Sequence, residues 1–211
     1  MSGTMTGPGA TRAGVRKWWS IAEFDRLLAG GFLREGGRTF LWDGEIIEAM
    51  SENPPHVNAV ANLVDLLRGR FPSARWTVSQ GAPIVLAEGY KPQPDITVIR
   101  GARSAFRGRT PAASDVVLLV EVADGAYSED ASAFLRAYAA AGIPRYWIVN
   151  IAGRRIEAYS SPNGVAGYRD RRDYGCGATV PLPDLAADGP MPGVEVSDVL
   201  LDSLDSPGDG A

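Results

Sequence analysis

The chain has 211 residues, of which 45% are hydrophobic and 22% are charged, and these values are ordinary for one globular domain. Its formal net charge of −4 argues against strong non-specific attraction to a polyphosphate. No apolar run approaches the roughly 18 residues that span a bilayer, and Cys176 is the only cysteine, so we expect a cytoplasmic protein without disulfides or membrane association.

The composition changes at both ends of the chain. Residues 1–17 contain no apolar segment of the kind found in a signal peptide and predict a disordered tail. Residues 203–211 are polar and predict a second flexible tail. The intervening residues 18–202 show no internal repeat and are expected to form one domain.

The first predicted elements alternate between helix and strand. Residues 20–31 predict a helix, with a serine–glutamate capping box at its start and two glycines at its end. An Asp-Gly pair between apolar runs predicts a hairpin within residues 38–50. Apolar side chains at helical spacing predict a helix over residues 55–71, and short strands are expected at 75–79 and 82–87.

The second half of the chain predicts most of the sheet. A strand opens at Asp95, and the nearly continuous apolar run at residues 115–124 is typical of a central strand buried on both faces. A helix is predicted over residues 128–142, capped by Ser128. Further strands are expected at 144–150, 154–160, 167–174 and 178–182. These elements predict an α/β or α+β fold.

Two acidic residues in these strands are candidates for metal binding. Asp95 begins one strand, and Glu121 interrupts the apolar run, where an unpaired carboxylate costs several kcal/mol. Two oxygen ligands at the ends of adjacent strands, with water in the remaining positions, are typical of protein Mg²⁺ sites. The alternative is that Glu121 pairs with an arginine inside the fold, and spacing alone leaves both interpretations open.

Several segments together resemble one protein family. The strands "PQPDITVIR" and "VVLLVEVAD" are followed by a helix and by "AAAGIPRYWIVN". In this order they resemble the bacterial Uma-two family of restriction endonucleases, which belongs to the PD-(D/E)XK nuclease superfamily. "WDGEIIEAMSENPPHVNAVANLVDLL" extends the resemblance to roughly residues 20–200. It implies a restriction-endonuclease-like mixed sheet flanked by helices.

The resemblance also implies a site and its ligands. Asp95 matches the aspartate of the PD motif and Glu121 the acid of the second motif, so both would bind Mg²⁺ or Mn²⁺ together with the backbone carbonyl of Val122. His56 matches a histidine at the start of the second helix, and Asp130 matches an aspartate early in the helix that follows the acidic strand. The implied substrate is DNA, and the implied assembly is a homodimer.

Two positions depart from the family pattern. Phe40 stands where the family has a glutamate, and Phe134 stands where it has the lysine that holds the attacking water. Arg136 faces about 200° away on the same helix, and Lys91 lies about 13 Å along an extended chain from Asp95, so neither is expected to replace that lysine. Phe134 itself fits an apolar stripe and is expected to lie in the core.

These observations give competing functions. The first is a metal-dependent endonuclease that is weak or inactive because of Phe134. The second is a non-catalytic protein on the nuclease fold that binds nucleic acid or acts in an assembly. A small-molecule enzyme has no support, because no phosphate-binding glycine loop or nucleophile triad is present. Asp124, next to the acidic strand, either adds a carboxylate to the site or caps a loop.

Overall fold

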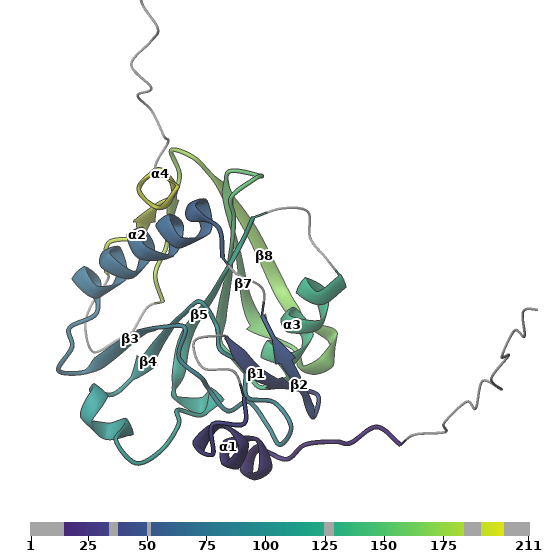
Figure 1. Ribbon diagram of the computed structural model, residues 1–211. Helices are drawn as coiled ribbons and strands as arrows, with labels where there is room; N and C mark the ends of the chain where they lie inside the picture. Colours follow the sequence, from purple (N-terminus) through teal and green to yellow (C-terminus); the bar gives the residue numbers. More distant parts are fainter. Residues whose placement is uncertain (1–14, 34–37, 50–51, 125–128, 184–190, 201–211) are drawn as a thin grey trace, which may run out of the picture.

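A six-stranded mixed sheet forms the centre of the computed structural model, which describes residues 15–33, 38–49, 52–124, 129–183 and 191–200 (Figure 1). The strand order is β3-β4-β5-β6-β7-β8. Neighbours β5 and β6 run parallel, and the other neighbouring pairs are antiparallel. The strands are β3 (Trp76–Gln80), β4 (Ile96–Arg100), β5 (Val116–Ala123), β6 (Arg145–Asn150), β7 (Arg155–Pro162) and β8 (Tyr168–Gly175).

The predicted central strand, β5, lies inside this sheet. Its first five residues, Val116 to Val120, are all buried, as expected for an apolar run covered on both faces. Alternate side chains enter different parts of the core: Leu118 and Val120 join one cluster, whereas Leu119 joins the other. Glu121 follows directly, so the acid sits where the strand leaves the most deeply buried part of the sheet.

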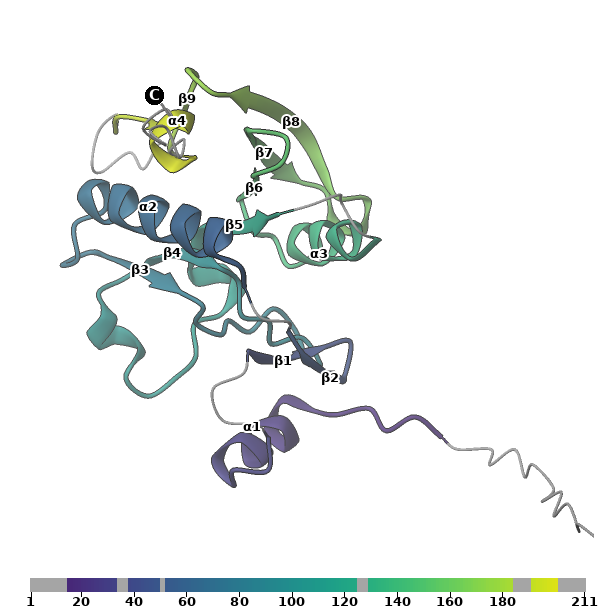
Figure 2. The same ribbon diagram turned by 45° about the horizontal axis from the view of Figure 1, so that its top comes forward.

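Helices cover both faces of the sheet. Helix α2 (Pro54–Arg70) packs with α4 (Val196–Val199) over the cluster that contains Leu118, and α3 (Glu129–Ala140) contributes Tyr138 to the cluster that contains Leu119 (Figure 2). Within the described part of the chain, every helix is too short or too polar to cross a bilayer. The mixed sheet with flanking helices confirms the predicted fold class.

The predicted hairpin and first helix form a smaller unit beside the sheet. Strands β1 (Thr39–Trp42) and β2 (Glu45–Glu48) are joined by Asp43 and Gly44, both with positive φ, as a two-residue hairpin turn requires. Helix α1 (Ile21–Ala29) begins with the predicted capping box. The unit is tied to the rest of the domain because Leu41 and Lys91 exchange backbone hydrogen bonds.

Three predictions differ from the structure or lie outside it. Residues 82–87 form no strand, because Gly81 turns the chain with φ 57° and Pro83 has no N–H to donate. The segment 178–182 does not join the main sheet; its β9 (Thr179–Val180) pairs with β10 (Val194–Glu195). Ser128 and the tail 203–211 lie outside the described residues, as does most of the tail 1–17. The 3₁₀ turns are Arg103–Phe106, Ala113–Asp115 and Gly164–Ala166.

We predict that Gly89→Ala destabilises the protein. Gly89 has φ 79°, and its carbonyl accepts a 3.0 Å hydrogen bond from Gly44 N–H, while an added Cβ would run into the ring of Trp18. The left-handed backbone alone costs about 1–2 kcal/mol for alanine, and the displaced ring adds to that cost. Urea unfolding measures the change in the free energy of unfolding.

Gly69→Ala is the matched control for this substitution. Gly69 lies inside α2, and an added Cβ would meet nothing within 4 Å. Alanine should therefore raise the free energy of unfolding by about 0.4–1 kcal/mol. Equal effects of the two substitutions would contradict the role given to Trp18 and Gly89.

Candidate active site

Asp95 is the centre of the candidate site. It stands immediately before β4, and its side chain is only 5% exposed. Its carboxylate Oδ2 accepts a 2.7 Å hydrogen bond from the backbone N–H of Val122. The predicted role of the Val122 carbonyl as a metal ligand is not tested by this contact, because the N–H rather than the carbonyl faces Asp95.

Glu121 lies next to Asp95 on β5. Its Oε2 accepts a 3.2 Å hydrogen bond from the backbone N–H of Asp95, and its Oε1 accepts a 2.7 Å hydrogen bond from the Tyr138 hydroxyl. The backbone nitrogen and the carboxylate oxygens of one aspartate lie within roughly 4 Å of each other, so the two carboxylates are at most about 7 Å apart. The structure therefore places the carboxylates of Asp95 and Glu121 close to each other, as a shared site requires.

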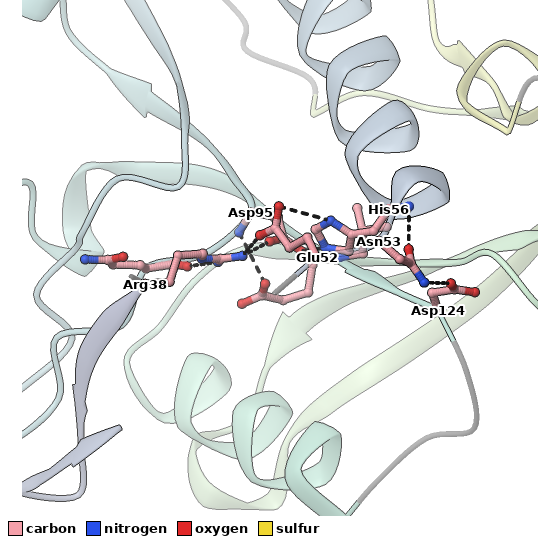
Figure 3. Close-up of polar contacts among 9 residues, drawn as sticks. Arg38, Glu52, Asn53, His56, Asp95 and Asp124 are labelled. Atoms are coloured by element: carbon pink, nitrogen blue, oxygen red, sulfur yellow. Dashed lines mark hydrogen bonds and ion pairs between the residues drawn. The ribbon is translucent and has the colours of Figure 1, made fainter. Parts of the chain in front are cut away.

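The start of α2 supplies the next two side chains (Figure 3). Asn53 caps the helix by accepting a 3.1 Å hydrogen bond from the backbone N–H of His56. This cap fixes His56 one turn into the helix, where its Nε2 lies 3.2 Å from Asp95 Oδ2 and its Nδ1 lies 3.4 Å from Glu52 Oε2. His56 is buried, and its Nδ1 makes no well-aligned hydrogen bond with the described residues.

Arg38 enters the site from the residue before β1. Its Nη1 donates a 2.6 Å hydrogen bond to Asp95 Oδ1 and a second, short one to Glu52 Oε1, while Nη2 donates to the backbone carbonyl of Gln93 (Figure 3). From the sequence, an arginine partner is expected only for Glu121, as the alternative to a metal. The structure gives the arginine to Asp95 instead, from 57 residues away along the chain.

The charges of these groups depend on one another. Burial alone would raise the pKa of Asp95, but the His56 hydrogen bond, the Arg38 charge and the Val122 N–H outweigh it and hold that pKa below its usual range. The hydrogen bond to Asp95 raises the pKa of His56. Burial, assisted by the negative charge of Asp95, raises the pKa of Glu121 to about 8.

A set of possible metal ligands is present. Donor atoms of Glu52, His56 and Asp95 all lie within 4.8 Å of one another, and Glu121 is not a member of this group. Two carboxylates and an imidazole with a buried, poorly bonded Nδ1 are a chemically suitable donor set for a divalent cation. Arg38 contacts both carboxylates, so a positive charge already lies beside this set.

The side of Glu121 that faces α3 is aromatic. The ring of Phe134 lies 4.2 Å from that of Trp42, 5.9 Å from that of Tyr138 and 6.3 Å from that of Phe40, measured between centroids. Phe134 is partly buried and packs against the core, as expected. The two positions that depart from the family pattern therefore pack against each other, and the described side chains in contact with both rings are aromatic.

The remaining candidates lie outside the centre or outside the description. Lys91 is buried 2.5 Å from Asp25 Oδ1, which agrees with its expected absence from the site. Asp124 is exposed and accepts a hydrogen bond from the Asn53 side chain. Asp130 falls within α3, but its side chain is outside the described part of the structure, so its predicted role stays a prediction.

Sequence reasoning missed Arg38 and Glu52. Arg38 belongs to no motif, and only the pairing of the hairpin with the segment before Asp95 brings it near. Glu52 is four residues before His56, a spacing that places both side chains on one side of a helix start. That spacing was the available signal for Glu52, whereas no local signal existed for Arg38.

Comparisons with known proteins agree with this architecture. Residues 21–189 match the model of the Uma2 family, described as "Putative restriction endonuclease". A crystal structure described as "a putative nuclease belonging to DUF820 from Anabaena variabilis" superimposes with a TM-score of 0.65, covering 86% of this chain and 97% of that one. At 14% sequence identity this likeness shows the fold alone. No curated protein matches the chain.

We predict that the metal-free protein loses stability as the pH rises. The pKa of Glu121 is raised from 4.5 to about 8, so the folded state binds this proton more tightly than the unfolded state does. The resulting stability is complete below about pH 4.5 and is lost as the pH rises toward 8, and His56 acts in the same direction because its pKa is also raised. The melting temperature, measured with a chelator from pH 5.5 to 8.5, should fall.

Glu121→Gln should flatten this dependence, since glutamine carries no proton that titrates. Asp65→Asn, an exposed change on α2 of the same chemical kind, should leave the wild-type slope intact. A wild-type melting temperature that rises from pH 5.5 to 8.5 would contradict the prediction. Equal dependence of the melting temperature on pH for wild type and Glu121→Gln would contradict it as well.

Proposed function

The chain belongs to the Uma2 restriction endonuclease family, and from this we propose that it is a slow, divalent-metal-dependent endonuclease that acts on DNA. The observation that carries the proposal is the convergence of a buried Asp95 with Glu121 on one side and with Glu52 and His56 on the other. Acidic residues are brought together at this density where a cation offsets their repulsion.

Asp95 would be the central ligand of this cation. Glu52 and His56 offer a carboxylate and an imidazole beside it, and Glu121 offers a second carboxylate from β5. Because imidazole is a softer ligand than carboxylate, the set favours Mn²⁺ over Mg²⁺. When bound, the cation would lower the pKa of a coordinated water and offset the charge that builds on the phosphate.

Arg38 would supply the fixed positive charge that Phe134 cannot. Its guanidinium stays protonated at all relevant pH values and already lies against Asp95 and Glu52. It can therefore stabilise a phosphate oxygen that gains negative charge, but it cannot accept a proton from the attacking water. Because Arg38 can stabilise the charge on the phosphate but cannot accept the proton, we expect a low rate of cleavage rather than none.

One observation favours a second candidate function. The aromatic contacts among Phe40, Trp42, Phe134 and Tyr138 fill the side of Glu121 where the family pattern has a glutamate and a lysine. A site closed in this way would suit a protein that binds nucleic acid, or acts in an assembly, without cutting. The two candidates differ in whether a metal produces strand breaks.

We expect purified protein to nick supercoiled plasmid slowly with Mn²⁺ and still more slowly with Mg²⁺. Asp95→Ala should abolish nicking, because it removes the carboxylate that Arg38, His56 and the Val122 N–H all contact. Mn²⁺ should also raise the melting temperature of the wild type by several degrees but not that of Asp95→Ala, and this readout does not depend on activity. Metal-induced stabilisation without any nicking would select the non-catalytic candidate.

Arg38→Gln should have opposite effects on metal binding and on cleavage. Removing a positive charge next to Asp95 and Glu52 should tighten Mn²⁺ binding by roughly tenfold, because like charges no longer repel. Nicking at saturating Mn²⁺ should nevertheless fall by roughly a hundredfold if Arg38 stabilises the transition state. Isothermal titration calorimetry and the plasmid assay measure the two effects. Weaker Mn²⁺ binding together with unchanged nicking would contradict the role given to Arg38.

A further inference from the structure

Two adjoining hollows follow the outer strand of the sheet, away from the catalytic groups. The larger has a volume of about 480 Å³ and runs along β3 from Thr77 to Gln80, and the smaller, of about 350 Å³, lies at the Trp76 end. Both are bounded by Arg68 of α2 and Arg103 of the 3₁₀ turn that follows β4. Strand β3 is an edge strand of the sheet (Figure 1).

The groove concentrates unpaired positive charge. Arg68, Arg103 and Arg107 line it and are exposed. Among the described residues, no acid lines either hollow, and none of the three arginines makes an ion pair or hydrogen bond. Some arginines outside the groove are instead paired with an acid, for example Arg109 with Asp115 and Arg171 with Asp173. In a chain of net charge −4, three free guanidinium groups in one groove make a local site for an anion.

One end of the groove lies beside the candidate active site. Gln80 lines both the larger hollow and a hollow of about 260 Å³ that is bounded by Arg38, Glu52 and Asp95. The backbone keeps this end of the groove close to Asp95, because Gln80 pairs with Ile96 across β3 and β4, and Gly81 N–H donates a 2.9 Å hydrogen bond to the Asp95 carbonyl. A polymer lying along β3 would therefore reach Asp95 at the Gln80 end.

We propose that this groove binds the phosphate backbone of the DNA that enters the active site, with Arg68, Arg103 and Arg107 contacting successive phosphates. The proposal rests on the proposed function for its substrate. From Trp76 to Gln80 the strand rises about 13 Å, close to the rise of four base pairs at about 3.4 Å each, so the groove is long enough for three phosphate contacts. The guanidinium groups provide bidentate donors that match phosphate oxygens.

The test measures binding of a fluorescein-labelled 20-base-pair duplex by anisotropy, in EDTA and between 50 and 200 mM KCl. The absence of metal prevents cleavage, so the result does not depend on nuclease activity. Arg103→Gln with Arg107→Gln should weaken binding at least tenfold at the lower salt concentration. The slope of log K against log salt concentration should fall by about 1.8, since each lost phosphate contact removes about 0.9.

Matched variants separate the groove from net charge. Arg136→Gln with Arg172→Gln makes the same change in charge at exposed positions on α3 and β8, and it should leave both affinity and slope close to wild type. Arg68→Gln, on a different element from Arg103, should reduce the slope by about 0.9 on its own. All five substituted positions are exposed, so the melting temperatures should stay near that of the wild type.

The outcomes distinguish this proposal from the proposed function. Groove variants that lose binding while wild type fails to nick DNA would support the groove and refute the nuclease. Groove variants that bind like wild type, or like the Arg136 and Arg172 pair, would overturn the groove even if nicking occurs. Wild type that binds polyglutamate but not the duplex would mean that the groove takes an acidic protein segment. A dimer that dissociates on Arg103→Gln would mean that it takes a second copy of the chain.

Discussion

The burial of the Asp95 carboxylate is the constraint on which the arrangement of the site depends. A carboxylate that is 5% exposed costs several kcal/mol unless its oxygens are bonded. The Val122 N–H, the His56 ring and the Arg38 guanidinium meet this requirement from β5, from α2 and from the segment before β1. Three parts of the chain that are far apart in sequence are therefore held in place by one side chain.

The sequence predicted the sheet because its strongest signals are local. The apolar run of β5, the Asp-Gly turn of the hairpin and the capping box of α1 each depend on residues within a few positions of one another, and all three appear in the structure. The segment 82–87 forms no strand despite its alternating pattern, because alternation alone does not determine whether a neighbouring strand is available for pairing. Val85 makes only an isolated bridge with Ala112.

The site was only partly predictable for a related reason. Asp95, Glu121 and His56 carry motif signals, and the structure places them within contact of one another or of a shared neighbour. Arg38 carries no such signal, since its role depends on how the hairpin packs against the residues before β4. Lys91 and Arg136 lie within a few residues of the motif positions and can be considered from the sequence. Arg38 comes close to Asp95 only through tertiary packing, which the sequence does not show.

The two faces of the acidic pair have opposite characters, and this limits how a substrate could approach. Toward α3, Glu121 is covered by the Tyr138 hydroxyl, behind which the aromatic rings of Phe134 and Trp42 pack together. Toward β3, the hollow bounded by Arg38 and Asp95 shares the lining residue Gln80 with the arginine-lined groove. A phosphate is attracted to the arginines on the β3 side, whereas on the aromatic α3 side it would lose its hydration without gaining a charged partner. We infer that a negatively charged substrate reaches Asp95 from the β3 side. A lysine on α3, where the family pattern has one, would lie on the opposite side of the acidic pair. It could contact such a substrate only if the aromatic cluster opened.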